Sequence, residues 1–332
     1  PKGLMQRHLL AIAVILTAAT GCDNVAWGGL DIDLRSPPTS SKLNSSEAVA
    51  PVDTLPMQTH GPLLLAGLHS GSRATLVVVG ELDGDALAPF PDPDSLQETE
   101  ALRTLTRAGS RWTLFSEGVR VGTLIVDAAT VEQEFCPLKL SVSGMVELVP
   151  TANGVERLLA LPESTGGTRA YEPYRVINHV YDQRVATLSI ASAAIPRVGA
   201  AFPPDGLLAA RQDIQAFEMA GSPGATIAAT FIYRDELAIA PPGQDAYSLF
   251  LVGAQDGELY EEAFIWYRPV EGTGKGAPSY FNHLDWNNDG QAEILLDVFG
   301  SERRWFATLA KRNGEWIRTY QDACGLDQPS GS

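Results

Sequence analysis

The sequence predicts a mainly β protein built from antiparallel sheets, arranged as a sandwich or as propeller-blade-like repeats, with one or two short helices. Short apolar runs recur from residue 62 onward, and the run 138–149 begins with strict alternation of apolar and polar side chains, as in a half-buried strand. Turn dipeptides such as Asp256-Gly257 and Asn313-Gly314 separate apolar runs, which favours hairpins. With 45% apolar residues, the chain can bury a core.

The expected strands follow one another along the chain. Their ranges are 74–80, 111–116, 119–126, 138–149, 184–191, 226–233, 247–252 and 304–310. Helices are expected at only two places. Residues 95–107 carry a possible N-terminal cap at Ser95 and a leucine stripe at Leu96, Leu102 and Leu105, and a shorter helix is expected at 206–211.

We expect four segments in the chain. They are a signal peptide at 1–21, a lipid-anchored flexible tether at 22–60, an N-terminal β-rich domain at 61–155 and a C-terminal β-repeat domain at 156–326. Residues 36–60 are rich in Ser, Pro and Ala and show no lasting periodicity, which is typical of a tether. Glycines and turn formers between 150 and 168 indicate the domain boundary.

The first residues have the layout of an export signal. Lys2 and Arg7 precede the apolar run 9–16, and small residues lead from there to Cys22. The apolar run is shorter than the roughly 20 residues of a membrane-spanning helix. The pattern Ala19-Thr20-Gly21-Cys22 resembles the lipobox of bacterial lipoproteins, although that family usually has Leu where Ala19 stands. A soluble secreted protein cut at the same bond is the alternative.

The lipobox resemblance implies an exported lipoprotein anchored through a lipid on Cys22. Its expected location is the periplasmic side of the inner membrane or the outer membrane, and Asp23 resembles the residue that retains lipoproteins in the inner membrane of enteric bacteria. The chain has three cysteines. Because an oxidising compartment favours disulfides, we expect Cys136 and Cys324 to form one; two separate buried thiols are the alternative.

The charge balance argues against nucleic-acid binding. Lys and Arg number 24 against 40 Asp and Glu, a net charge of −16, and loss of Lys2 and Arg7 with the signal peptide would make it −18. An acidic surface repels phosphate backbones and offers no basic patch for anionic lipid. We therefore expect attachment to the membrane through the lipid on Cys22, and an envelope protein as partner.

Residues 285–293 carry the sharpest chemical signal. Oxygen-bearing side chains stand at positions one, three, five and nine, Gly290 stands at six, and a backbone carbonyl at seven completes the set; these residues are Asp285, Asn287, Asp289, Glu293 and Gln291. Calcium takes about six to eight oxygen ligands, and alternate residues of a tight loop can all point inward. Leu296 occupies position twelve, so the loop is not an EF-hand. We expect a structural calcium here; a plain Asn-Asp-Gly turn is the alternative.

This loop resembles the calcium loops of FG-GAP and VCBS-type β-repeats, Asp-x-Asp-x-Asp-Gly-x-x-Asp followed directly by a strand. The resemblance covers residues 281–320, with Asn287 and Glu293 replacing two of the aspartates. The loss of one charge at Asn287 is expected to weaken affinity. Residues 217–227 align without a gap with 284–294, which suggests an earlier repeat that has lost its ligands; chance similarity between two hairpins is the alternative.

Two functional hypotheses remain open, and the non-enzymatic one is favoured. The sequence contains no nucleophile elbow and no His-Glu-x-x-His motif, and His283 beside the loop is expected to be a surface or packing residue. The first hypothesis is a membrane-tethered extracytoplasmic lipoprotein that acts as a binding or assembly module. The alternative is an exported carboxylate-dependent hydrolase acting on polysaccharide or another envelope substrate. It requires Asp83, Asp85 or Asp289 to face another acid in a deep cleft.

Overall fold

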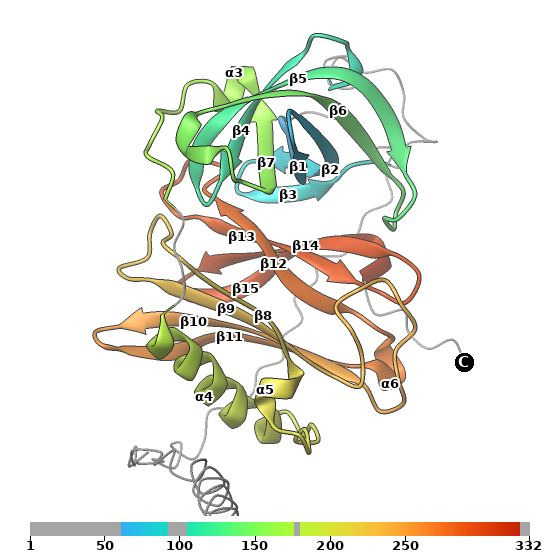
Figure 1. Cartoon of the computed structure of the whole chain (residues 1–332), viewed down its shortest axis with the longest axis vertical. Helices are drawn as coiled ribbons and strands as arrows, with labels where there is room; N and C mark the ends of the chain where they lie inside the picture. Colours follow the sequence, from blue (N-terminus) through green and yellow to red (C-terminus); the bar gives the residue numbers. More distant parts are fainter. Residues whose placement is uncertain (1–60, 92–104, 176–179, 326–332) are drawn as a thin grey trace, which may run out of the picture. The chain divides into compact units, whose positions relative to one another are not determined.

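The structure is a computed structural model that describes residues 61–91, 105–175 and 180–325 (Figure 1). The expected signal peptide, the tether, Cys22 and most of the helix expected at 95–107 lie outside the described residues. Within them, Leu105 is helical and buried. The mainly β, antiparallel fold class is confirmed, because every pair of strands within the three sheets is antiparallel.

The first sheet closes on itself as a barrel. Its strands are β1 (Leu63–Ser70), β2 (Arg73–Asp83), β3 (Ala86–Pro89), β4 (Arg111–Ser116), β5 (Val119–Glu132), β6 (Lys139–Leu148) and β7 (Arg157–Pro162). They run in the order β1-β7-β4-β5-β6-β2-β3, and β1 also pairs with β2. Closure gives β1 a partner on both sides and leaves β3 as the edge strand; a barrel was not among the arrangements expected. Because β7 pairs with β1 and β4, the barrel continues past residue 155 to Pro162.

Alternation along the strands builds two cores around the barrel wall. The inward side chains fill the barrel, and the alternation at 138–149 places Leu140 and Val142 among them. Outward side chains such as Leu64 and Val79 instead pack against Phe281 and other residues of the last sheet. The barrel wall therefore has an apolar inner face and a partly apolar outer face that supports the C-terminal half.

Two four-stranded meanders form the C-terminal half. The first meander contains β8 (Arg211–Phe217), β9 (Thr226–Tyr233), β10 (Tyr247–Asp256) and β11 (Leu259–Pro269); the second contains β12 (Ala277–Leu284), β13 (Glu293–Phe299), β14 (Arg304–Arg312) and β15 (Glu315–Gln321). The aligned segments occupy equivalent places: Phe217 and Leu284 end the first strands, and Thr226 and Glu293 begin the second. Their origin as a repeat stays a prediction.

The meanders pack face to face through a shared apolar core. Phe250 and Trp266 of the first meet Leu296 and Trp305 of the second. The helix α4 (Tyr181–Arg197) covers the other face of the first meander (Figure 1). The hairpin at Asn313-Gly314 has positive φ at both residues, 53° and 89°, as a type I′ turn requires.

The strand expected at 184–191 is wrong, because these residues lie inside α4. The buried side chains of α4 recur at helical spacing; they are Gln183, Thr187, Ile190, Ala191, Ala194 and Ile195. A short apolar run does not distinguish a strand from a helix, and here packing onto the first meander selects the helix. The helix expected at 206–211 is confirmed as α5 (Leu207–Ala210).

The other helical segments are single turns: η2 (Pro150–Ala152), α3 (Glu163–Gly166), α6 (Val270–Thr273) and η3 (Ala323–Gly325). Among the described residues, no helix combines the length and the apolar character needed to cross a membrane.

Candidate metal centre

The acidic loop (residues 285–293) connects β12 to β13 at the point where their pairing ends with Leu284 opposite Glu293. Two of its residues have left-handed backbone, Asn288 at φ 62° and Gly290 at φ 88°. Asn and Gly are the residues that adopt this conformation at least cost. The local sequence therefore favours the tight reversal that brings the loop's side chains together.

Backbone hydrogen bonds hold three predicted ligands on the loop. The carboxylate of Asp285 accepts the N–H groups of Asp289 at 3.0 Å and Gly290 at 2.8 Å. Asn287 Oδ1 accepts the Asp289 N–H at 3.1 Å, and Asp289 Oδ1 accepts the Gln291 N–H at 2.8 Å. Asn287 also donates to Asp289 Oδ2 at 3.1 Å. The structure thus brings Asp285, Asn287 and Asp289 together, and Gln291 joins them through its backbone N–H rather than through the predicted carbonyl oxygen.

The fourth predicted side chain, Glu293, is a buried acid. It is 2% exposed, and neither carboxylate oxygen makes a hydrogen bond of ordinary geometry. Burial raises the pKa of Glu293 to about 8, and the nearby Asp289 and Asp285 raise it further, while the Trp286 backbone amide and Arg312 oppose them. An ionised carboxylate left in this state is costly. A cation beside an ionised Glu293 would remove that cost, and the oxygen atoms of the loop are of the kind that calcium binds.

The predicted ligands do not converge on a single metal position. In the part of the chain that the structure describes, no three His, Cys, Asp or Glu side chains converge closely enough to hold a metal. The set on the loop is mixed, with two aspartates and one glutamate accompanied by the neutral oxygens of Asn287 and Gln291. Calcium suits such a set because it accepts carboxylate, amide and backbone oxygens in flexible geometry.

Two arginines from distant segments flank the loop. Arg169, which follows α3, donates to the backbone oxygens of Asp285 at 2.5 Å and Trp286 at 3.0 Å. Burial lowers the pKa of Arg169, and Asp285 and Glu293 raise it. On β14, Arg312 lies 3.9 Å from Asp289 Oδ2. The sequence analysis missed both arginines. Arg169 and Asp285 are 116 positions apart, and no local pattern brings either arginine to the loop.

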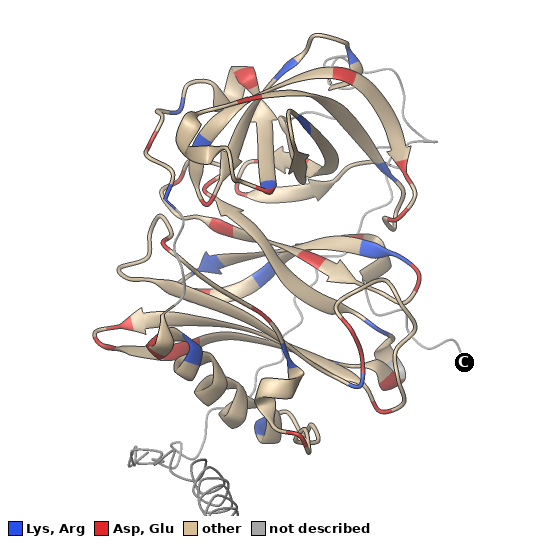
Figure 2. Cartoon of the chain, in the orientation of Figure 1, with Lys and Arg blue, Asp and Glu red and all other residues tan. Residues whose placement is uncertain are grey.

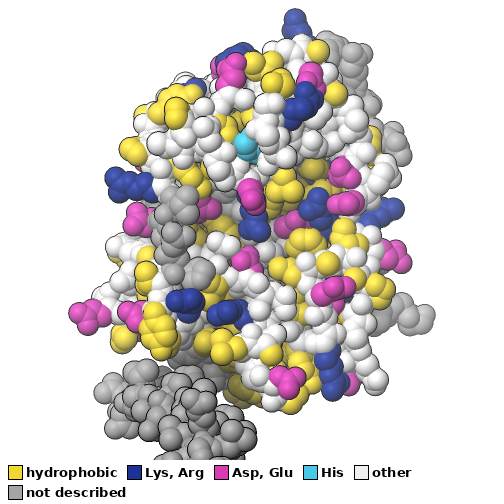
Figure 3. All heavy atoms as spheres, in the orientation of Figure 1, with side chains coloured by type: hydrophobic (Ala, Val, Ile, Leu, Met, Phe, Trp, Pro, Cys, Tyr) yellow, Lys and Arg dark blue, Asp and Glu magenta, His cyan; other side chains and the backbone are white. Residues whose placement is uncertain are grey.

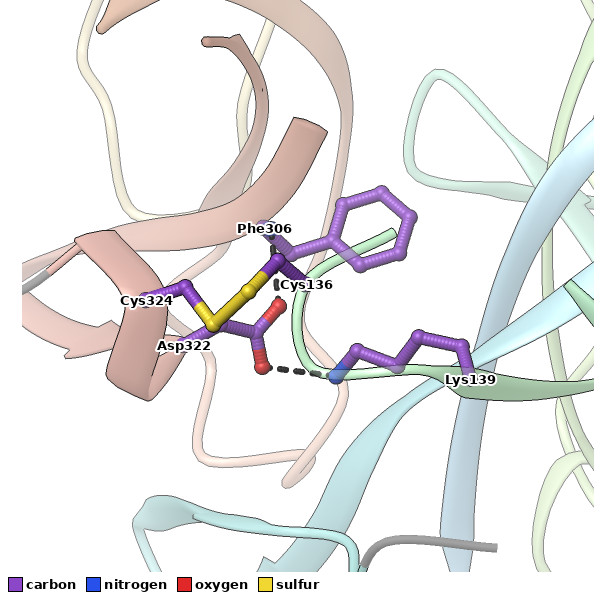
Figure 4. Close-up of a disulfide and its surroundings, with 5 residues drawn as sticks. All are labelled: Cys136, Lys139, Phe306, Asp322 and Cys324. Atoms are coloured by element: carbon purple, nitrogen blue, oxygen red, sulfur yellow. Dashed lines mark hydrogen bonds and ion pairs between the residues drawn. A yellow bond between two sulfur atoms is a disulfide. The ribbon is translucent and has the colours of Figure 1, made fainter. Parts of the chain in front are cut away.

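A second group of residues, the covalent junction, ties the barrel to the second meander (Figure 4). The expected disulfide between Cys136 and Cys324 is present, with 5.6 Å between the Cα atoms. Beside it, Lys139 Nζ lies 2.6 Å from Asp322 Oδ1 and 2.9 Å from the Val79 carbonyl oxygen. Asp322 Oδ2 accepts the N–H of Phe306 at 2.9 Å. Both charged groups are almost fully buried and both are paired.

We expected His283 to be a surface or packing residue, and the structure shows that it is a packing residue. Its ring is 1% exposed and stacks on Phe217 at 4.9 Å between ring centroids. Its Nδ1 lies 2.7 Å from the hydroxyl of Tyr280, which donates to Glu117 at 3.0 Å. Burial lowers the pKa of His283 to about 4. Because the Glu117 N–H also bonds Asn282 at 2.8 Å, this cluster joins the β4–β5 turn to β12.

An open groove of about 470 Å³ lies where the β10–β11 and β14–β15 hairpins come together. Its charged and aromatic lining is Asp256, Glu261, Glu262, Lys311, Glu315 and Trp316. The strand pairings place these hairpins at the same end of the meanders as the acidic loop. Asp83, Asp85 and Asp289 do not line the groove.

No protein-family model matches the chain, and neither a curated protein nor a solved structure matches it.

Proposed function

We propose that the protein is a membrane-tethered extracytoplasmic lipoprotein that acts as a binding or assembly module and is stabilised by a structural calcium. The observation that carries this proposal is the Cys136–Cys324 disulfide, because structural disulfides persist mainly in oxidising compartments. With these two paired, Cys22 is the remaining cysteine of the three in the chain. It stands where a lipobox cysteine would receive its lipid.

The calcium component is supported by the unpartnered carboxylate of Glu293. Asp285, Asp289 and Glu293 would supply the charge, and Asn287 and the Gln291 carbonyl would supply neutral oxygens. The ion would neutralise acids that otherwise repel one another and would stiffen the connection between β12 and β13. This role is structural, since the loop lies at the end of a hairpin and outside the lining of the groove.

The surface supports a binding module better than a carboxylate-dependent hydrolase. Asp85 and Asp289 do approach a common residue, Asn287, but both are exposed on turns and neither lines the groove. Charged residues are spread over the barrel and the meanders (Figure 2), and apolar side chains lie among them on the face in Figure 3. Exposed apolar side chains near α4 suit contact with a partner; they are Val180, Tyr181, Val185, Phe202 and Leu208.

The lipid anchor is tested by expressing the full chain in a Gram-negative bacterium with a labelled fatty acid, alongside Cys22→Ser. We expect label and membrane association for the wild type and neither for the variant. The mass of the mature N-terminal peptide identifies the modified residue. Release of an unlabelled protein cut before Cys22 would favour the soluble secreted alternative.

The calcium component is tested by thermal unfolding of the full chain with calcium and with excess chelator. At calcium a hundredfold above Kd, binding adds about 2.7 kcal/mol to the free energy of unfolding. Asp289→Ala should lose this gain. Asp256→Ala, in the turn of the β10–β11 hairpin, should keep it. Equal melting curves for the wild type with and without calcium would reduce the loop to an ordinary turn.

A further inference from the structure

The acidic loop has a neighbour in the barrel that its own sequence does not include. Asp85 lies in the turn between β2 and β3, and its Oδ1 is 3.5 Å from Asn287 Nδ2. The backbone oxygen of Asp85 accepts a hydrogen bond from Arg312 at 2.6 Å. The same arginine faces Asp289 of the loop at 3.9 Å. The barrel turn is therefore held against the loop from two sides.

This contact falls at the position where the loop lacks a charge. Asn287 is neutral, and its amide group has two functions: Oδ1 faces the loop backbone, while Nδ2 points to Asp289 and to Asp85. A carboxylate that accepts from Nδ2 fixes which end of the amide faces the loop. Asp85 also brings a negative charge close to the position from which one is missing.

We propose that Asp85 is a positioning residue for calcium binding by the acidic loop, so that calcium occupancy and docking of the β2–β3 turn strengthen each other. The inference rests on the proposed calcium function. Groups that orient a ligand from outside the coordination sphere commonly change metal affinity by about tenfold or more. Coupling of this kind is reciprocal: if docking of the turn tightens calcium binding, calcium tightens docking by the same factor.

The experiment compares Asp85→Asn with Asp83→Asn in the full chain. Both variants remove one charge from an exposed residue of the β2–β3 hairpin, Asp83 at the end of β2 and Asp85 in the turn, but of these two only Asp85 contacts the loop residue Asn287. Calcium affinity is measured by titration of chelator-stripped protein with calcium chloride. We expect Asp85→Asn to weaken affinity about tenfold and Asp83→Asn to stay within about twofold of the wild type.

Hydrogen exchange provides a second readout that a purely local stabilising role would not change. Calcium should slow exchange of the amides at 84–86 in the wild type, and this protection should be lost in Asp85→Asn. The turn at 257–258 in the first meander serves as the internal control. Equal affinities for the two variants, or no calcium-dependent protection at 84–86, would overturn the coupling while leaving calcium binding intact. No calcium binding by the wild type would overturn both proposals.

Discussion

Two of the contacts between the barrel and the second meander differ in whether their buried charges are paired. At the covalent junction, Lys139 and Asp322 are both buried, and each has a charged partner and a backbone partner. At the acidic loop, Glu293 is equally buried, but neither of its oxygens makes a hydrogen bond of ordinary geometry. A buried charge is tolerated when it is paired and is costly when it is not. The first contact is therefore complete in the protein alone, whereas the second contains a buried acid with a raised pKa, which the calcium ion that we propose would pair.

Opening the disulfide should cause the largest loss of stability. The bond closes a loop of 188 residues, for which the chain-entropy model gives about 5 kcal/mol. Cys324→Ser should lower the free energy of unfolding by about that amount in urea titrations of the full chain, and Cys136→Ser with Cys324→Ser should lose no more. A loss below about 1 kcal/mol would show that the non-covalent contacts hold the junction by themselves.

Removing Lys139 should be nearly as damaging. Lys139→Met leaves Asp322 buried without its cation, and breaking a buried pair from one side typically costs about 3–5 kcal/mol. Arg111→Met is the matched control, because Arg111 pairs with Glu163 at 3.2 Å on the surface, where a pair contributes about 0–1 kcal/mol. Equal urea midpoints for the two variants would contradict the expectation that the buried ion pair contributes more to stability than the surface pair.

Asp297 is a buried acid that is only partly paired, so its charge is better compensated than that of Glu293 and less well than that of Asp322. It gives a pH-dependent test. Its Oδ2 accepts from Arg304 at 2.9 Å, while its buried Oδ1 has no partner. Burial raises the pKa of Asp297 to about 6, against the opposing effect of Arg304. Below its ordinary pKa both folded and unfolded chains carry the proton. As the pH rises toward 6 the unfolded chain loses its proton first, so stability falls, and above 6 the full penalty remains.

The variant Asp297→Asn has no carboxyl group at this position and therefore no pH-dependent cost of burying it. The stability of the variant relative to the wild type should therefore rise by about 2–3 kcal/mol between about pH 3.5 and pH 7. Urea unfolding at several pH values measures the difference, and the pH dependence common to both proteins cancels. A difference that does not change with pH would mean that Asp297 titrates normally.

Local sequence predicted much of this molecule because strands and turns are local features. The strands expected at 111–116 and 226–233 have the same bounds as β4 and β9. The acidic loop forms a tight turn that brings Asp285, Asn287 and Asp289 close together, while their binding of calcium stays a prediction. The sequence analysis did not predict helix α4, because a short apolar run such as 184–191 fits the period of a strand and that of a helix equally well. Only packing against the rest of the fold distinguishes the two.

The remaining features depend on contacts between distant residues. Barrel closure requires β1 to pair with β7, and no local pattern encodes that pairing. Asp85 and Arg312 meet across 227 positions. The burial of Glu293, which carries the argument for a cation, arises from packing around β13 and not from its neighbours in sequence. Sequence reasoning therefore identified candidate ligands but not what surrounds them.

The smallest expected effect is on the calcium affinity of the acidic loop. Asn287→Asp restores the charge missing from the acidic loop and should tighten calcium binding by a few-fold, about 1 kcal/mol or less, because Asp85 already supplies a negative charge nearby. Without calcium the same variant should be less stable than the wild type, since three carboxylates then face one another. In an Asp85→Asn background the gain in affinity from Asn287→Asp should be larger.

Such non-additivity between two substitutions is the signature of residues that act on one site. Calcium titrations of the wild type, both single variants and the double variant measure it directly. Equal gains in the two backgrounds would mean that Asp85 and Asn287 contribute independently. The barrel contact would then add stability at the loop without setting its calcium affinity, and the covalent junction and the acidic loop would differ only in their pairing of charge.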